Sequence, residues 1–174
     1  MLERELVEPV RQYLAGLGYR VFVDPDGSDY FDVVARHGEE VGLVELKVAD
    51  YRKVLAQAHR RRGFGDWVAV VLPRKTLVDK LLALPSTERG RRVGVWHLYR
   101  GEVFVDRPAS PLVAPGESAA FPEARARLVE LLDAMEAGEL PEGVRWEGIS
   151  AVPGGGHRRR ATRDWRLDEF GPVP

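Results

Sequence analysis

Hydrophobic residues in the first part of the chain recur first with the period of a helix and then with that of strands. Residues 19–23 alternate between the two faces of a strand. Residues 30–47, which read YFDVVARHGEEVGLVELK, predict a β-hairpin that turns at Gly38 and Glu39. The helical stripe that precedes both, within residues 2–17, consists of Leu2, Leu6, Val10, Tyr13, Leu14 and Leu17.

The middle of the chain continues with a helix and a strand. Residues 51–62 predict a helix that begins after Asp50, a favourable N-cap, and ends at Gly63. The continuous apolar run at 67–72 is typical of a strand that is buried on both faces. Because a helix crosses over between them, this strand should run parallel to the second strand of the hairpin. In the helix we expect Val54, Leu55 and Ala58 to face the sheet, with Lys53, Gln57, Arg60 and Arg61 on the other side.

This order of elements predicts an α/β (α+β) fold, in which an αβββαβ core forms a central mixed sheet flanked by helices. A chain of 174 residues suits one domain with a short appendage. The later elements are a helix at 75–84 with Leu77, Leu81 and Leu82 inward, strands at 92–98 and 102–105, and a helix at 122–137 that presents Leu128, Leu131, Leu132 and Met135 and stops at Gly138.

We divide the chain into three parts on the basis of composition. Residues 1–107 form the expected core. Residues 108–149 provide a linker and an amphipathic helix, packed on the core or on a dimer partner. Residues 150–174 form a basic tail rich in Gly and Pro.

Composition narrows the classes of protein. The hydrophobic share of 44% and the charged share of 30% are those of a globular protein with a substantial core. The absence of cysteine excludes disulfides, thiolate metal sites and cysteine nucleophiles. No apolar stretch approaches the roughly 18 residues of a membrane span, so we expect a cytoplasmic protein without a membrane partner. A net charge of −1 argues against coating of nucleic acid by bulk electrostatics and leaves room for a local basic surface.

Three charges interrupt the apolar strands of the hairpin: Asp32, Glu45 and Lys47. With a two-residue turn, the numbers of facing residues sum to 77, so Asp32 faces Glu45 and their Cβ atoms lie about 4.5–5.5 Å apart. Lys47 follows Glu45 by two residues and shares its face. Two facing carboxylates become stable when a cation such as Mg²⁺ lies between them.

A purely structural interpretation of these charges is an exposed hairpin face with a Glu-Lys ion pair, worth at most about 1 kcal/mol. It explains one charge and leaves the other two without a reason. The helix at 51–62 offers a basic surface with no acid, which we assign to nucleic-acid binding, the alternative being a solvated surface. Its candidate contacts are Lys53, Arg60, Arg61 and Arg62.

With Asp32, Glu45-Leu46-Lys47 and Gln57 placed on an αβββαβ string, the first two thirds of the chain resemble the PD-(D/E)XK, or restriction endonuclease-like, nuclease superfamily. The resemblance implies that Asp32, Glu45 and the carbonyl of Leu46 hold Mg²⁺ or Mn²⁺. It also implies that Lys47 orients the attacking water or stabilises charge on the phosphate, with Gln57 beside the site. Phe31 stands where the family motif begins with Pro.

Acids of the first helix are further metal ligands in many members of this superfamily. Here Glu3, Glu5 and Glu8 are the candidates. The run Glu3-Arg4-Glu5-Leu6-Val7, with Gly18-Tyr19 and Ser28 after it, is similar to archaeal Holliday-junction resolvases. On that likeness we rank Glu3 first, Glu8 second and Glu5 third.

The expected function is that of a divalent-metal-dependent endonuclease that hydrolyses DNA, with a homodimer needed to cut both strands. One alternative, from a different class, is a nucleic-acid-binding or assembly module that keeps the fold without the chemistry. A junction resolvase or an RNA nuclease would use the same site. The sequence does not choose among these substrates, because loop shape and dimer geometry decide between them.

Overall fold

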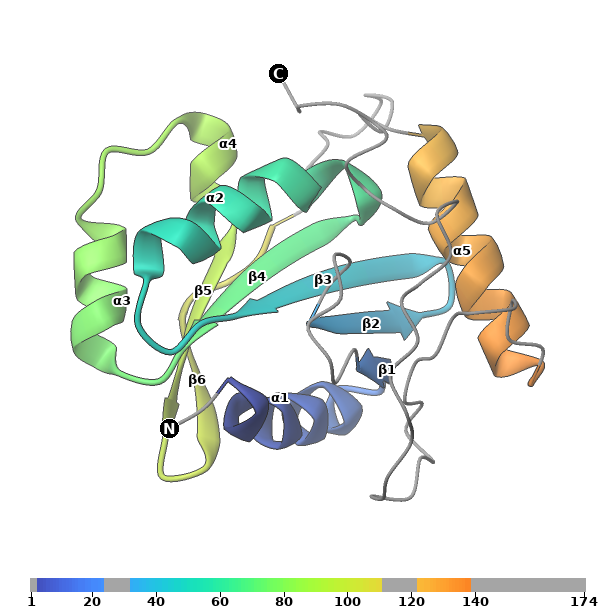
Figure 1. Cartoon of the computed structure of the whole chain (residues 1–174), viewed down its shortest axis with the longest axis horizontal. Coiled ribbons are helices and arrows are strands. Elements are labelled where there is room, and N and C mark those ends of the chain that lie inside the picture. Colours follow the sequence, from blue (N-terminus) through green and yellow to red (C-terminus); the bar gives the residue numbers. More distant parts are fainter. Residues whose placement is uncertain (1–2, 24–31, 111–121, 139–174) are drawn as a thin grey trace.

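The computed structural model describes residues 3–23, 32–110 and 122–138, without the side chains of 60–62, 88–89 and 124. Its first seven elements follow the predicted αβββαβ order, with a short 3₁₀ turn before the fourth strand (Figure 1). The elements are α1 (Arg4–Gly16), β1 (Arg20–Val23), β2 (Val33–His37), β3 (Glu40–Leu46), α2 (Tyr51–Arg61), η1 (Arg62–Phe64), β4 (Trp67–Leu72), α3 (Lys75–Leu82), α4 (Glu88–Arg91), β5 (Gly94–Tyr99), β6 (Glu102–Arg107) and α5 (Pro122–Glu136).

The strands form one six-stranded mixed sheet in sequential order, β1 to β6. Strand β2 is antiparallel to both β1 and β3, whereas β3, β4 and β5 run parallel to one another. The last strand, β6, returns antiparallel to β5. The expected mixed sheet flanked by helices is therefore confirmed, as is the parallel pairing of β3 with β4 across the α2 crossover.

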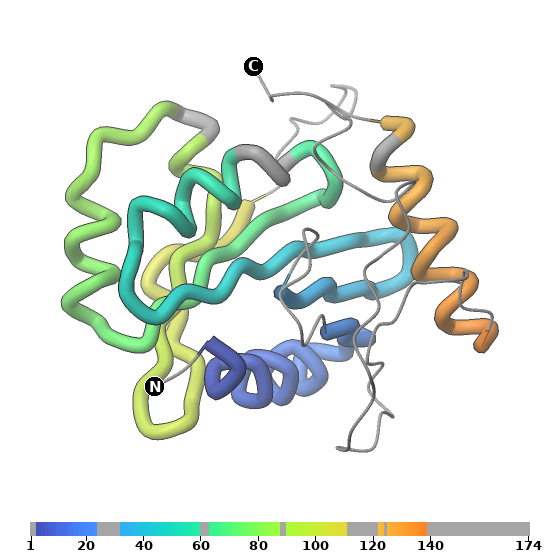
Figure 2. The backbone as a smooth tube through the Cα atoms, in the orientation of Figure 1, coloured from blue at the N-terminus to red at the C-terminus, as the bar shows by residue number. Residues whose placement is uncertain are grey.

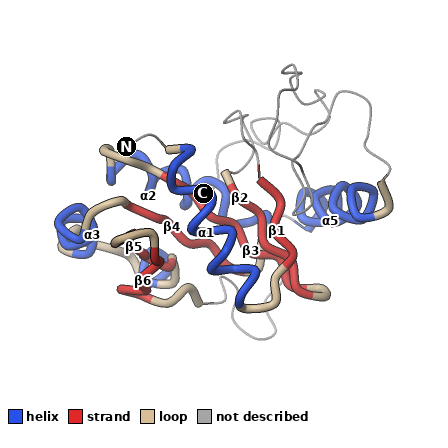
Figure 3. The backbone as a smooth tube through the Cα atoms, turned by 90° about the horizontal axis from the view of Figure 1, so that it is seen from below, coloured by secondary structure: helices blue, strands red, loops and turns tan. Residues whose placement is uncertain are grey.

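Helices cover the two faces of the sheet unequally. Helix α1 packs on one face through Leu6, Val10 and Leu14, and among the described helices it alone lies on that side of the strands (Figures 2 and 3). Helices α2, α3 and α5 supply the apolar residues of the opposite face. The core thus consists of two hydrophobic clusters, one on each face of the sheet. Successive residues of the inner strands belong to one cluster and then the other, because successive side chains of a strand point to opposite faces.

The register of the first hairpin follows the predicted sum of 77. Val33 pairs with Val44 and His37 with Glu40. Gly38 has a φ of +59°, a left-handed conformation that glycine adopts without steric cost and that a two-residue hairpin turn requires. The turn residue therefore fixes which side chains of the two strands face one another.

Helix α5 packs on the face that carries α2. Leu128, Leu131 and Leu132 are buried there in the same cluster as the strand residues. Two ion pairs attach the helix at its sides: Arg125 with Asp66 at 2.8 Å, and Arg36 with Asp133 at 2.6 Å. The helix ends at Glu136, and Gly138 follows with a φ of +78°, as the sequence predicts.

The prediction for α3 was partly wrong. Val78 and Leu81 are the buried residues, whereas Leu82 is 37% exposed. Because Val78 and Leu81 are three residues apart, they define the face toward the sheet, and Leu82 lies 100° further round the helix. The four-residue helix α4 was not predicted at all.

The linker between 111 and 121 and the basic tail at 150–174 lie outside the described residues. Within the described residues, no helix is both long and apolar enough to cross a membrane.

Candidate functional site

Glu45 is the only charged residue that is fully buried in the described part of the chain, with 1% of its surface exposed. It lies near the end of β3, between Val44 and Leu46, and pairs with Val70 of β4. Its strand neighbours on the same face, Val41 and Leu43, pack against α2. A carboxylate in such apolar surroundings is costly unless a counter-charge or hydrogen bonds compensate for the loss of water.

Asp32 stands one residue before β2, where the register places it opposite Glu45. Its Oδ2 atom accepts a hydrogen bond of 2.7 Å from the backbone N–H of Leu46. This bond ties the start of β2 to the end of β3 and fixes one carboxylate oxygen beside the Glu45-Leu46 peptide. Because Val34 belongs to the α2 face, alternation along the strand places Asp32 on that face with Glu45.

Lys47 continues the β3 to β4 ladder, because its backbone N–H donates to the carbonyl of Val71 at 3.1 Å. Its side chain is largely buried, with 18% exposed, and Nζ lies 2.6 Å from Oε1 of Glu3. Strand alternation alone directs Lys47 to the α2 face. The ion pair shows instead that the side chain reaches the start of α1, which lies beside the end of β3 (Figure 1).

The three candidate acids of the first helix therefore have different surroundings. Glu3 contacts Lys47. Glu8 is exposed and binds Arg11 and Gln12, and the hydrogen bond from Arg11 lowers the pKa of Glu8 more than its partial burial raises it. Glu5 is exposed as well. The contact with Lys47 brings Glu3 to the end of β3, and no such contact links Glu8 to it.

Gln57 lies on α2, which begins as predicted: the backbone N–H of Lys53 donates to Oδ1 of Asp50 at 3.0 Å. The expectation that Gln57 faces away from the sheet was wrong. Gln57 follows Val54 by three residues and precedes Ala58, both fully buried, so helical spacing turns it toward the sheet. Its Oε1 atom is buried and has no hydrogen-bond partner within the described residues. A buried polar oxygen of this kind is rare and marks a place for a water or an ion.

The expected basic surface is described only in part. Lys53 is exposed on α2. The side chains of Arg60, Arg61 and Arg62 lie outside the described set, although their backbone forms the end of α2 and the start of η1. The nucleic-acid contacts expected from these residues stay a prediction.

The donor set suits Mg²⁺ or Mn²⁺. Within the described ranges, no group of three or more His, Asp or Glu residues is close enough to hold a metal ion. Asp32 and Glu45 nevertheless supply two carboxylates, and the carbonyl of Leu46 adds a third oxygen. Mg²⁺ is commonly held by one or two carboxylates and completes its octahedron with water or phosphate. The Oε1 atom of Gln57 lies on the same face and has no partner within the described residues. It could accept a hydrogen bond from a metal-bound water.

Sequence analysis missed a second polar cluster at the end of β5. Nδ1 of His97 lies 2.6 Å from Oδ2 of Asp106, and Oδ1 of that carboxylate lies 3.2 Å from Nζ of Lys75. The register of β5 and β6 shifts next to Trp96, and Asp106 lies at that irregularity. The sequence does not reveal this β-bulge. The residues that face each other on β5 and β6 beyond it therefore could not be predicted by counting from the turn.

Comparison with known proteins adds a likeness of fold alone. No protein-family model and no curated protein matches the chain. Among solved structures, the chain is similar to a protein of unknown function from Silicibacter pomeroyi, with 14% sequence identity and a TM-score of 0.52. The match covers 87% of this chain and 98% of that one. The described α/β architecture therefore recurs in a second protein at low sequence identity.

Proposed function

We propose that the protein is a divalent-metal-dependent nuclease of the PD-(D/E)XK type that hydrolyses phosphodiester bonds of DNA. The observation that supports it best is the hairpin register, which, extended by one residue, puts the half-buried Asp32 opposite the fully buried Glu45. A structural protein gains nothing from two like charges at such a position. The αβββαβ element order agrees with a restriction endonuclease-like core.

In this proposal Asp32 and Glu45 hold Mg²⁺ or Mn²⁺ together with the carbonyl of Leu46. When bound, the metal would neutralise charge on the scissile phosphate and lower the pKa of a water. Asp32 is positioned for this task because the N–H of Leu46 occupies its Oδ2 atom and thereby orients the carboxylate. The apolar strands around Glu45 exclude bulk water, which strengthens the attraction between its carboxylate and a cation.

Lys47 is the proposed source of positive charge beside the phosphate. Its ammonium can hydrogen-bond the attacking water or a phosphate oxygen and stabilise the charge that develops there. Glu3 holds Nζ at 2.6 Å in the structure. Glu3 thus has two proposed tasks, to position Lys47 and to serve as the additional acid of the site, with Glu8 as the less favourable candidate.

The proposed substrate is DNA, and Lys53 with Arg60, Arg61 and Arg62 would contact its phosphates. One site cuts one strand, so cleavage of both strands implies a homodimer. A junction resolvase and an RNA nuclease remain alternatives that share the site. The non-catalytic alternative keeps nucleic-acid binding and lacks cleavage.

A substrate panel tests the proposal. Purified protein with Mg²⁺ or Mn²⁺ receives supercoiled, linear, single-stranded and four-way-junction DNA, and RNA, with Asp32→Asn as the control variant. If the wild type cleaves a DNA substrate and the Asp32→Asn variant does not, the result would support a nuclease. Selective cleavage of the four-way junction would identify a resolvase. Gel shifts with DNA in the absence of cleavage and of Mn²⁺ binding would favour the non-catalytic module.

A further inference from the structure

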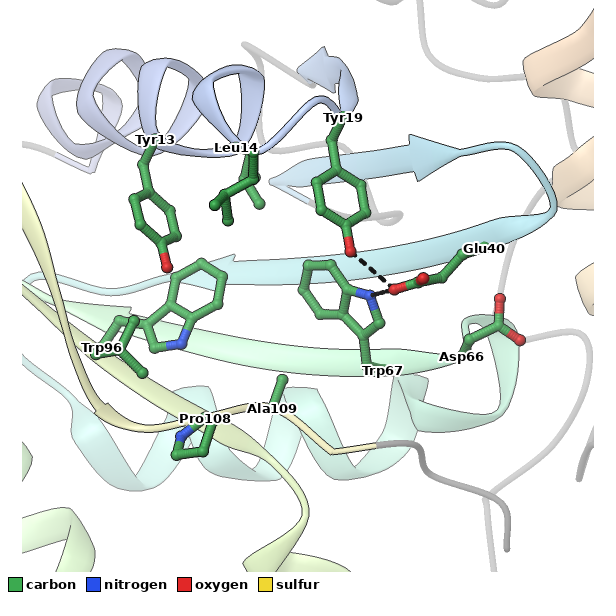
Figure 4. A pocket seen from close by; sticks show the side chains of 11 residues that line it. Tyr13, Leu14, Tyr19, Glu40, Asp66, Trp67, Trp96, Pro108 and Ala109 are labelled. Carbon is green, nitrogen blue, oxygen red and sulfur yellow. Dashed lines mark hydrogen bonds between the residues drawn. The ribbon is translucent and has the colours of Figure 1, made fainter. Parts of the chain in front are cut away.

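A cavity of about 440 Å³ lies on the α1 face of the sheet. Its walls come from the second half of α1, the beginnings of β3 and β4, and the segment after β6 (Figure 4). The pair Asp32 and Glu45 belongs to the opposite end of β3 and to the other face. The cavity is lined by Tyr13, Leu14, Leu17, Tyr19, Glu40, Asp66, Trp67, Trp96, Val105, Pro108 and Ala109.

Four aromatic rings form a continuous wall of this cavity. Tyr19 meets Trp67 edge to face at 5.7 Å, and Tyr13 meets Trp96 in the same way at 5.4 Å. The two indoles lie 6.1 Å apart with their planes inclined by 45°. Because neighbouring rings are strongly inclined to one another, their faces point in several directions. The negative faces of indole and phenol rings attract cations.

The charge on the wall is also negative. Oε1 of Glu40 accepts hydrogen bonds from the Tyr19 hydroxyl at 2.8 Å and from Nε1 of Trp67 at 2.5 Å, as Figure 4 shows. Both donors are neutral, and within the described chain no cation forms an ion pair with Glu40. The other acid of the wall, Asp66, is balanced by Arg125. The lining residues include no Lys, Arg or His.

Glu40 is itself exposed, and the Tyr19 phenol that donates to it is partly buried. Burial of the phenol raises the pKa of Tyr19, and the hydrogen bond to Glu40 raises it further. The carboxylate therefore borders the aromatic rings at the edge of the cavity, where a bound cation would meet both. The cavity thus has the charge and the lining that a cation of low hydration requires.

Trp96 is the most deeply buried aromatic residue of the wall. Only 5% of its surface is exposed, and its Nε1 atom is buried with no acceptor among the residues that the structure describes. Buried indole N–H groups usually find a partner. Because this atom has no accessible surface, it does not reach the cavity, and Trp96 contributes its ring alone.

We propose that this cavity binds a small organic cation of the quaternary ammonium class. The aromatic wall and Glu40 would contact the cationic group. An anion would meet an unbalanced carboxylate, and a neutral aromatic molecule would leave that carboxylate without a counter-charge. A metal ion would find apolar rings where it needs oxygen ligands. The proposal is independent of the nuclease proposal.

Calorimetric titration of the full chain with choline tests this proposal. A parallel titration uses the uncharged isostere of choline, in which a quaternary carbon replaces the nitrogen. The two probes have the same shape and hydroxyl group and differ in charge alone. We expect choline to bind about tenfold or more tightly than the isostere, the size of a desolvated cation–π attraction. Equal affinities, or no heat from choline at millimolar concentration, would overturn the proposal.

Glu40→Gln supplies the matching variant, because an amide oxygen still accepts the two hydrogen bonds but carries no charge. We expect it to remove most of the preference for choline over the isostere. Glu39→Gln, at the adjacent exposed position, is the control and should keep that preference. Circular dichroism checks that both variants are folded. A Glu40→Gln protein that is folded and retains the full preference would contradict the assignment of Glu40.

Discussion

The Nζ atom of Lys47 lies 2.6 Å from Oε1 of Glu3, so an ion pair joins the end of β3 to the start of α1. The two residues are 44 positions apart in the chain, and only the packing of α1 against the sheet brings them together. The contact places an ammonium group and a third carboxylate near the end of the strand that carries Glu45. It separates Glu3 from Glu8, which binds Arg11 on the exposed side of α1.

We predict that Glu3→Gln lowers the rate of DNA cleavage by about 10–100-fold, the usual loss when a positioning partner of a metal site is removed. Without the carboxylate, Lys47 loses the group that holds its ammonium. Glu8→Gln, on the same helix, should leave the rate unchanged. Equal rates for the two variants would show that the contact with Lys47 has no part in the reaction.

Lys47→Met should reduce cleavage by about 10²–10⁴-fold, the range for loss of a group that acts on protons or charge in the transition state. Binding of Mn²⁺ should persist, because Lys47 is not a ligand in the proposal. Lys80→Met, at an exposed position of α3, serves as the control. Steady-state cleavage assays and calorimetry with Mn²⁺ measure the two properties separately. If Lys47→Met also loses Mn²⁺ binding, Lys47 is needed to maintain the structure of the metal site and its role in the reaction is not shown.

Metal binding should stabilise the folded protein. At a metal concentration of 100 times Kd the free energy of unfolding should rise by about 2.7 kcal/mol. Glu45→Gln should abolish this increase, because an amide replaces the buried carboxylate at nearly the same volume. Thermal unfolding with Mn²⁺ and with a chelator gives the comparison. A stabilisation that survives in Glu45→Gln would mean that the metal binds elsewhere.

Gly42→Ala should destabilise the fold by about 1–3 kcal/mol or more through overpacking. A Cβ atom at this position would lie 1.9 Å from Cζ2 of Trp67, whose ring is buried against the strand. Gly16→Ala is the matched control: no atom lies within 4 Å of its added Cβ, and we expect a gain of about 0.5–1 kcal/mol in the helix. Denaturant unfolding of both variants measures the difference.

Tyr19 should make stability depend on alkaline pH. Its pKa in the folded state is raised above the ordinary value of 10.0, first by burial and then by the hydrogen bond to Glu40. The folded state therefore binds the phenolic proton more tightly than the unfolded state, and the stabilisation is complete below pH 10.0 and is lost as pH rises through the folded-state pKa. In unfolding measurements over that pH range, the Tyr19→Phe variant should lose less stability than the wild type. If the dependence of stability on pH has the same slope in both proteins, groups other than Tyr19 cause the loss.

The sequence was sufficient to predict the hairpin register, because a glycine at a two-residue turn and strict alternation of strand side chains leave one pairing. It also predicted the parallel β3 and β4, since a helix crosses between them. The side of α2 that Gln57 occupies was predicted wrongly, although its spacing from Val54 contained the answer.

Other features depend on tertiary packing that no local pattern reveals. The proximity of Glu3 to Lys47 arises from the place of α1 on the sheet. The contact of Asp106 with His97 lies beside an irregular register between β5 and β6. The aromatic wall joins Tyr19, Trp67 and Trp96 from different elements. In each case a long-range contact, absent from any window of the sequence, sets the geometry.

The most direct test of the proposed function is the rate of supercoiled plasmid nicking by the wild type and by Asp32→Asn, each with Mg²⁺ or Mn²⁺ and with a chelator. The nuclease proposal predicts nicking by the wild type only when metal is present, and none by a folded Asp32→Asn protein under any condition. Nicking by Asp32→Asn at the wild-type rate, or by the wild type at the same rate in chelator, would contradict it.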